Sequence, residues 1–457
     1  MSRRFRGAVS PVYLFLCLLL GGSAQGIFAN MILQLLGLGL IAWAALTTPR
    51  QEGGREQIQL FWLIMIALAL VAIQLIPLPP AVWTRLGGRN VIADGYRILG
   101  TATPWLPLSV APYDTLSSLL SLIPALAVLA TILRIGCKPW MLCTALVAGT
   151  FAGILLGALQ VSSANPATSP WYLYAETNPG LATGFFANAN HMADLLVITL
   201  PFLAAMLARA RESGRDGQSY SAAIVFVAGT ILVIAVGIAL NGSLAGYGLS
   251  LPVLAASALI AFPRARKFSN LLAPAAVVLI IGAIAWLSTT PLSTASGLQT
   301  TAQTSVQSRQ EILKTSLLAA SEYLPLGSGA GSFAQVYALY EDHDRLDPTT
   351  YVNHAHNDYV EIALEAGVPG IFLIVLFLGW WARSAWQKWQ QRSREPYASA
   401  AVVASAAILL HSFVDFPLRT AAISACFALC LALIVRSRPA PKPDKSQLWA
   451  TRHLVIE

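Results

Sequence analysis

The segment Tyr351–Gly370 reads YVNHAHNDYVEIALEAGVPG and gathers ionisable side chains that are scarce elsewhere in the chain. It holds two of the six histidines, His354 and His356, together with Asp358 and Glu361. Charged residues make up only 11% of the chain, whereas a soluble globular domain carries roughly 25%. Ionisable groups in an apolar chain are costly unless they face protein, water or a ligand. We therefore expect this segment to organise the functional site.

The rest of the chain has the composition of a series of membrane helices. Hydrophobic residues make up 56% of the 457 residues, and the mean hydropathy is +0.64. Apolar windows of about 20 residues recur, and each can cross about 30 Å of hydrocarbon as a helix. The sequence therefore predicts an all-α polytopic membrane protein with about twelve transmembrane helices. Their predicted positions are residues 11–29, 31–48, 58–78, 115–135, 139–160, 191–208, 221–240, 244–262, 272–288, 368–387, 398–414 and 419–436.

The basic residues predict the orientation of these helices. Cytoplasmic loops retain Lys and Arg, and most of the 29 basic residues fall on the side of the N-terminus when the spans alternate. Both termini are therefore expected in the cytoplasm. The net charge of +8 then reflects topology and attraction to anionic lipid, and nucleic acid is not expected as a partner. The outward-facing segments keep Arg85, Arg89, Arg97, Arg309, Lys314, Arg345 and Arg419.

The hydropathy pattern divides the chain into regions. Residues 1–288 carry about nine transmembrane helices, 289–367 form a long helical periplasmic loop, 368–436 carry about three further helices, and 437–457 form a cytoplasmic tail. The first helix is expected to stay uncleaved, because the next span begins almost at once. The Pro- and Trp-rich loop 79–114 is expected to be irregular and structural. The five cysteines lie in or beside spans, which predicts buried thiols without an external disulfide.

The long loop begins with a predicted helix that carries Arg309. This helix is expected to open at Thr304 or Ser305 and to close near Tyr323, before Pro325. Arg309 and Leu313 lie four residues apart on one face, so an anchored Leu313 would carry Arg309 toward the interior. Its fork of donors suits a phosphate or a carboxylate. The following PLGSGAGSF has no βαβ context for phosphate binding, so we interpret it as a close-packed turn.

His356 is predicted to precede a helix N-terminus. Asn357 is a good N-cap, Asp358 suits the first turn, and Gly367 with Pro369 is expected to end the helix. The positive helix end disfavours an imidazolium, so His356 is expected to stay neutral and to accept a proton. A histidine that only bonds loop backbone is one alternative. A metal site is another, built from His343, His354, His356, Asp342, Asp344, Asp347 and Asp358.

A further polar group precedes the predicted span 191–208, where the chain reads GFFANANHMADLL. Asn188 and Asn190 can cap this helix, and His191 and Asp194 lie on its first turns. These residues either cap and pack the helix or line a polar cavity. Both interpretations stay open, because an ionisable group at membrane depth must face protein or water.

Several motifs together resemble the family of O-antigen ligases and Wzy-type polysaccharide polymerases. The resemblance covers about Phe185 to Arg436. It implies a bacterial inner-membrane enzyme of GT-C type that moves a glycan from undecaprenyl diphosphate to an acceptor hydroxyl, with inversion and without metal or cofactor. The motifs are Arg309 followed by Leu313, the glycine turn Pro325–Phe333, HAHNDY, His356 followed by Gly367, and HSFVDFPLR at His411–Arg419.

The resemblance also implies residue roles. His356 would be the base that acts on the acceptor, and Arg309 would hold the lipid diphosphate. Where relatives carry a second arginine, this chain reads NGSLAGYG with Leu244 at that position. Arg419 is the expected substitute, and Arg345 is the next candidate. Further predicted substrate-binding residues are His354, Asn357, Tyr359, Asn190 and His191.

The chemistry of the residues agrees with such a transfer. Diphosphate is a good leaving group, so a base and one or two arginines suffice, and the paired carboxylates of glycosidases are not needed. An exopolysaccharide or O-antigen polymerase is favoured, a ligase that transfers glycan to lipid A core is the first alternative, and a solute transporter is the competing class. The implied partners are the lipid-linked donor, the glycan or lipid A core acceptor, membrane lipid, a chain-length regulator and a flippase.

Overall fold

Apolar helices form most of the protein in the computed structural model, which describes residues 3–24, 27–47, 53–212, 217–262, 298–341 and 352–436. Eight helical segments in these ranges are long and apolar enough to cross a membrane. They are α2 (Phe28–Leu46), α3 (Arg55–Ile73), the run of α6 (Pro112–Ser121), α7 (Ile123–Ala130) and the π-helical turn Thr131–Ile135, then α8 (Pro139–Val161), α9 (Ala189–Glu212), α10 (Gly217–Asn241), α11 (Leu244–Ala261) and α16 (Asp358–Gln390).

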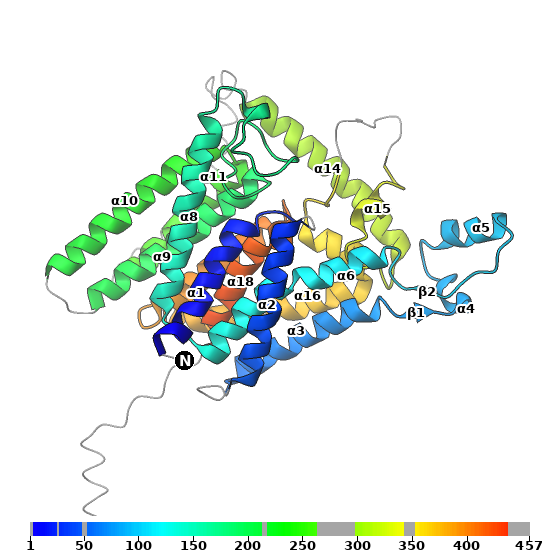
Figure 1. The fold of residues 1–457 in the computed structure, drawn as a ribbon, viewed down its shortest axis with the longest axis horizontal. Helices are drawn as coiled ribbons and strands as arrows, with labels where there is room; N and C mark the ends of the chain where they lie inside the picture. The colour runs from blue at the N-terminus through cyan, green and yellow to red at the C-terminus, as the bar shows by residue number, and fades with distance from the viewer. Residues whose placement is uncertain are drawn as a thin grey trace, which may run out of the picture.

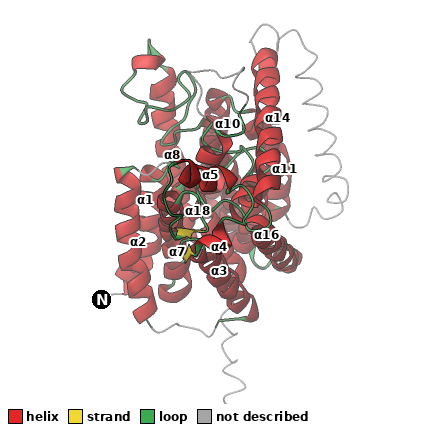
Figure 2. Ribbon diagram, turned by 90° about the vertical axis from the view of Figure 1, so that its right-hand side faces the viewer, coloured by secondary structure: helices red, strands yellow, loops and turns green. Residues whose placement is uncertain are grey.

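Three shorter apolar helices complete the described bundle: α1 (Arg3–Leu20), α17 (Pro396–His411) and α18 (Ala421–Val435). The predicted all-α polytopic membrane protein is therefore confirmed (Figures 1 and 2). The predicted span 272–288 and the predicted tail 437–457 lie outside the described residues. The total of about twelve spans thus stays a prediction, based on window length.

Helix α9 forms the centre of the bundle. Of its apolar window, 94% is buried, and α8, α10, α11 and α17 all pack against it. A helix that is apolar all round belongs in a core. Many buried residues of α17 are small, including Ala400, Ala404 and Ala407, which lets neighbouring helices approach it closely. This packing brings the first turn of α9 beside the segment that follows α17.

Helix α1 ends earlier than the predicted span 11–29, because two glycines pack against neighbouring backbone. A Cβ on Gly22 would lie 1.9 Å from the carbonyl oxygen of Phe185, so only glycine fits. Ala422 N donates to the carbonyl of Gly21 at 2.9 Å, and Ala187 N donates to that of Gly22 at 3.1 Å. The chain therefore leaves the helix to join the starts of α9 and α18.

The loop 79–114 is more regular than predicted. Strands β1 (Pro77–Leu78) and β2 (Leu106–Pro107) pair antiparallel, and α4 (Pro80–Trp83) and α5 (Asn90–Ile98) lie between them (Figure 1). The buried Arg89 donates to the carbonyls of Leu108 and Gly327, and its guanidinium lies 5.0 Å from the Tyr323 ring centroid. The predicted structural role is consistent with these contacts, which tie the loop to the glycine turn.

Helices α14 (Leu298–Tyr323) and α15 (Phe333–Tyr337) form an outer layer with a small core of its own. The predicted end of α14 at Tyr323 is confirmed, but the helix begins at Leu298, before the predicted Thr304 or Ser305. Ile312 is the buried residue of the turn after Arg309, while Leu313 is only half-buried. Ile312, and not the predicted Leu313, therefore anchors this face of α14.

The prediction that the helix ends at Gly367 is wrong. Helix α16 kinks at this residue and continues. Gly367 has φ 56° and ψ −147°, and Val368 N donates to the carbonyl of Pro325 at 2.8 Å. The segment before the kink therefore belongs to the outer layer, and the segment after it is the apolar span. The glycine turn is close-packed as predicted, since Gly329 N donates to the carbonyl of Glu365 at 2.9 Å.

Candidate functional site

A buried carboxylate, Asp415, is the centre of the candidate site. It lies between α17 and the 3-10 turn Pro417–Arg419, and its side chain is 0% exposed. Nη2 of Arg309 lies 3.5 Å from Oδ2, and Nδ1 of His356 lies 3.4 Å from Oδ1. Nε2 of His191 lies 3.7 Å from the same Oδ1. Residues predicted from three distant segments thus meet at one carboxylate.

The carboxylate of Asp415 also has neutral donors. Nδ2 of Asn190 donates to Oδ2, and the backbone N–H of Phe416 donates to Oδ1. Burial by itself raises the pKa of Asp415, but the nearby imidazoles of His191 and His356 hold that pKa well below its ordinary value. Asp415 is therefore ionised at neutral pH and carries the negative charge around which the site is built.

The backbone of His356 is held in a rare conformation. Its φ is 48°, and within the described chain it is the one non-glycine residue with positive φ. Oδ1 of Asn357 accepts the N–H groups of Tyr359 and Val360, which confirms the predicted N-cap. Asp358 N donates to the carbonyl of Ser412 at 2.9 Å. Strained backbone of this kind persists only where neighbours determine it, and here the cap and the Asp415 segment do so.

One phenyl ring packs against three imidazoles. The ring centroid of Phe416 lies 5.0 Å from that of His191, 4.2 Å from that of His354 and 5.0 Å from that of His356. These contacts restrict the rotation of the rings. They also place an apolar surface beside the polar groups, which excludes water from one side of the Asp415 cluster.

The predicted residues His354, Asn357 and Tyr359 lie around this centre. Nδ1 of His354 lies 2.8 Å from Oε1 of Glu361. The hydroxyl of Tyr359 donates to the carbonyl of Leu409 at 2.8 Å, and Nδ2 of Asn357 donates to that of Phe413 at 3.0 Å. Tyr359 and Asn357 therefore fasten α16 to α17 and the segment after it. His354 bonds to α16 and is the one of the three that packs against Phe416.

Arg419 is bound by carboxylates of α16. Its Nη2 lies 3.0 Å from Glu365 and 3.3 Å from Glu361, and its Nε lies 3.6 Å from Asp358. Burial lowers the pKa of Arg419, but the three carboxylates outweigh it and raise that pKa above its ordinary value. A guanidinium so compensated has little charge left to offer a diphosphate. The use of Arg419 as the second clamp stays a prediction, and a diphosphate there would compete with these three carboxylates.

The polar residues in and before the first turn of α9 divide between the two interpretations: Asn188 caps the helix, and His191 lines a polar cavity. Asn188 caps the helix, since its Oδ1 accepts the N–H of Asn190 at 2.8 Å. Asn190 lies inside the helix and does not cap it; its Oδ1 accepts the hydroxyl of Ser243 at 2.7 Å. His191 and His356 both line a polar cavity of about 190 Å³. Leu244, where a second arginine was expected, begins α11 directly after Ser243 and is 42% exposed.

Some predicted residues lie outside the described ranges, namely Arg345 and the acidic and histidine residues at 342, 343, 344 and 347. The structure does not test a role for them. Within the described ranges, no group of three or more His, Cys, Asp or Glu side chains is arranged to hold a metal ion. The five cysteines are buried and free, as expected.

The sequence pattern did not single out Asp415 or His411, and it left Asp194 open between helix packing and a polar cavity. His411 and Asp415 stand four residues apart, between two apolar spans, and could have been noticed as ionisable groups at the membrane edge. Nδ1 of His411 lies 2.7 Å from Oδ2 of Asp194, and both side chains are almost fully buried. Asp194 lies one helical turn after His191 in α9, and His411 ends α17 four residues before Asp415.

The fold and the site define a polytopic membrane protein with a buried carboxylate, two imidazoles and a guanidinium at one end of a helix bundle. Residues 228–375 match the family model Wzy_C, described as O-antigen ligase, and the enzymes of that family are glycan transferases. The match includes Arg309 and His356 but not Asn190, His191 or Asp415. It is narrower than the resemblance from Phe185 to Arg436. A comparison with curated proteins found no match.

Proposed function

We propose that this protein is a metal-independent, inverting glycosyltransferase of GT-C type in the bacterial inner membrane. It transfers a glycan from undecaprenyl diphosphate to an acceptor hydroxyl, and polymerisation of an exported polysaccharide is favoured over ligation to lipid A core. The observation that carries the proposal is the meeting of His356 and Arg309 at Asp415, 3.4 Å and 3.5 Å from its two oxygens, within a chain that matches the O-antigen ligase family model over residues 228–375.

His356 acts as the base. An ionised carboxylate beside Nδ1 favours the tautomer with the proton on that nitrogen, which leaves the lone pair of Nε2 for the acceptor. The acceptor hydroxyl gives its proton to Nε2 while its oxygen bonds to the anomeric carbon. The bond from that carbon to the diphosphate oxygen breaks, and the lipid diphosphate leaves with the electron pair. Asp415 then stabilises the imidazolium that forms, as a buried negative charge should.

Arg309 holds the departing diphosphate. Its side chain is 30% exposed, and it contacts Asp415 through one terminal nitrogen, Nη2. A guanidinium presents five N–H donors, so the fork can bind phosphate oxygens while it keeps this contact. Charge that develops on the leaving oxygens is then neutralised by a group already in place.

The cavity beside His356 suits a hydroxyl-rich ligand. Besides His191 and His356, polar side chains line it, including Asn178, Asn188 and Asn353. Amide groups both donate and accept hydrogen bonds, which matches sugar hydroxyls. Its volume of about 190 Å³ is enough for part of a glycan, so we assign it to the sugar next to the reacting bond.

Substitution of the base and the clamp tests the proposal. We expect His356→Gln and Arg309→Gln each to reduce polymer formation by about 100-fold or more, because each removes a group that acts on the transition state. The readouts are surface polysaccharide and lipid-linked repeat units, and the latter should accumulate. Lys314→Gln, an exposed change on the same helix as Arg309, is the matched control and should leave polymer unchanged.

Deletion of the gene distinguishes the related functions. Loss of long polymer with single repeats on the lipid core supports polymerisation, whereas full-length polymer on its lipid carrier supports ligation. Altered uptake of a small solute, with an unchanged glycan profile in the His356 variant, would contradict glycan transfer and favour a transporter.

A further inference from the structure

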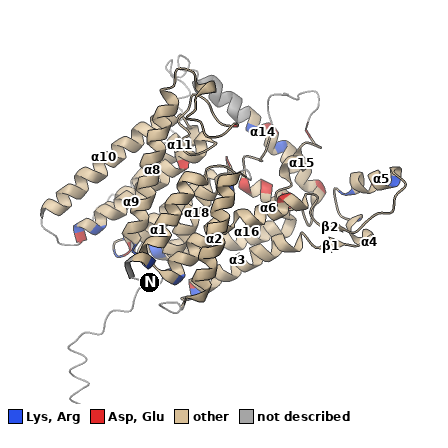
Figure 3. Ribbon diagram, in the orientation of Figure 1, with Lys and Arg blue, Asp and Glu red and all other residues tan. Residues whose placement is uncertain are grey.

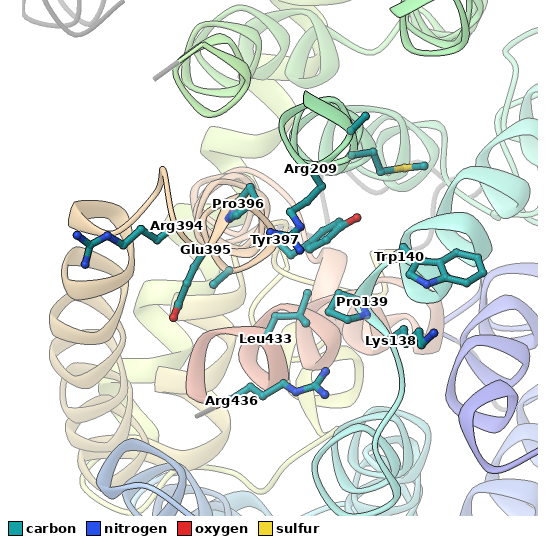
Figure 4. A pocket seen from close by; sticks show the side chains of 13 residues that line it. Lys138, Pro139, Trp140, Arg209, Arg394, Glu395, Pro396, Tyr397, Leu433 and Arg436 are labelled. Atoms are coloured by element: carbon teal, nitrogen blue, oxygen red, sulfur yellow. The ribbon is translucent and has the colours of Figure 1, made fainter. Parts of the chain in front are cut away.

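A second hollow lies at the end of the bundle opposite to Asp415. It measures about 700 Å³ and opens where α9 and α18 end and where α8 and α17 begin (Figure 4). The Asp415 site lies where α9 begins and α17 ends, so a full helix separates the two. The 16 residues of α17 correspond to about 24 Å. This hollow, the basal pocket, is therefore no part of the candidate active site.

The basal pocket carries an excess of positive charge. Lys138, Arg209, Arg394 and Arg436 line it, with Glu395 as the one carboxylate among its lining residues. Oε2 of Glu395 lies 2.9 Å from Nζ of Lys388, which is not part of the lining. Lys388 matches the charge of Glu395, and Glu212 matches that of Arg209. When both outside partners are counted, the lining still has a net positive charge.

Three of the cations surround the hollow. Figure 4 shows Lys138, Arg209 and Arg436 on different sides of it, whereas Arg394 points away. They come from the start of α8, the end of α9 and the end of α18. Nη1 of Arg436 donates to the carbonyl of Cys137 at 2.9 Å, and Nη1 of Arg209 lies 2.7 Å from Oε2 of Glu212. These contacts fix the guanidinium groups at the rim.

The rest of the lining is mostly apolar. Met206, Leu433 and Ala398 contribute to it, and Trp140 at its edge is 50% exposed. Tryptophan is favoured at the membrane interface. Basic pockets between helices on the cytoplasmic side of a membrane, where the distribution of Lys and Arg predicts this pocket to lie, bind anionic headgroups. A free phosphate would use the cations alone, whereas a lipid would use the cations and the apolar surface together.

We propose that the basal pocket binds an anionic membrane phospholipid. Its phosphate lies among Lys138, Arg209 and Arg436, and the upper part of an acyl chain covers the apolar surface. Because the cations belong to different helices, the lipid fastens α8, α9 and α18 together at this end. A ligand that binds only the folded state stabilises it, so the lipid raises the thermal stability of the bundle.

The experiment uses the full chain, purified in detergent and supplied with phosphatidylglycerol or phosphatidylcholine. Native mass spectrometry measures retained lipid, and a thermal scan measures Tm. We expect selective retention of phosphatidylglycerol and an increase in Tm. In the triple variant K138Q/R209Q/R436Q we expect affinity about 100-fold lower, since each cation near the surface contributes a several-fold factor. The control R55Q/R211Q/R383Q removes equal charge on the same face and should retain the lipid.

Two further arms separate the lipid from other occupants. Ala210→Trp fills the apolar lining and leaves the cations in place, so it should also displace phosphatidylglycerol. This variant replaces the triple variant as the test if the triple variant does not fold. Inorganic phosphate at millimolar concentration should neither compete nor raise Tm. Equal retention of phosphatidylglycerol by both triple variants, or competition by inorganic phosphate, would overturn the proposal. None of these readouts depends on glycan transfer.

Discussion

At the scale of single residues, the negative charge of Asp415 decides what its neighbours can do. It is fully buried between His191, His356 and Arg309, and it is the group that could orient His356. Its replacement by asparagine keeps the shape but removes the charge. We expect Asp415→Asn to lower transfer by about 100-fold to 10,000-fold, because the imidazole tautomer is no longer set. Polymer yield in membranes, with Asp94→Asn on the exposed helix α5 as control, measures this.

The same charge gives a pH dependence. The pKa of Asp415 is held below its ordinary value, so the carboxylate stabilises the fold above the unfolded pKa of about 3.9 and this contribution falls as the pH drops toward the folded pKa. We therefore expect the difference in Tm between wild type and Asp415→Asn to be largest near neutral pH and to shrink below about pH 4. A difference that grows on acidification would contradict this assignment.

At the scale of secondary-structure elements, the kink of α16 sets the position of the site. Gly367 has positive φ, and a Cβ there would lie 2.2 Å from the carbonyl oxygen of Pro325. Gly367→Ala is expected to destabilise the protein by about 1–3 kcal/mol or more through backbone strain. Gly379→Ala, in the same helix, is the matched control: a Cβ there meets nothing within 4 Å. It should be neutral or slightly stabilising, because alanine favours helix. Thermal unfolding distinguishes the two.

The first turns of α16 depend on Arg419. This residue compensates Asp358, Glu361 and Glu365, which are all buried. Breaking a buried ion pair costs about 3–5 kcal/mol, so Arg419→Gln should lower Tm strongly along with activity. Were Arg419 a diphosphate clamp, the variant would keep its Tm and show only a raised KM for the lipid-linked donor.

At the scale of the whole molecule, the bundle has two chemically different ends. Charged residues lie mainly near helix ends and in the outer layer, with long uncharged stretches between (Figure 3). The Asp415 site is at one end and the basal pocket at the other. The distribution of Lys and Arg predicts that the basal pocket faces the cytoplasm and that the site faces outward.

Thiol labelling of intact cells tests this orientation. Ser321 on α14 and Ser393 between α16 and α17 are both exposed and lie toward opposite ends of the molecule. An impermeant reagent should label Ser321→Cys in intact cells and Ser393→Cys only after permeabilisation. The native cysteines are buried, so the background should be low. The reverse pattern would place His356 on the cytosolic side and contradict the proposed donor.

The sequence by itself determined the membrane class, most span positions and the cap at Asn357, because hydropathy and capping are local properties of the chain. It also identified Arg309 and His356 as candidate site residues. Only the tertiary structure decided that Asp415 joins them, that Arg419 is held by carboxylates, and that Gly367 kinks a helix instead of ending it. These outcomes depend on which distant segments meet, such as Arg309 and Asp415, 106 residues apart, or Glu365 and Arg419, 54 apart. A local sequence pattern does not specify which distant residue a charged side chain contacts in the folded protein.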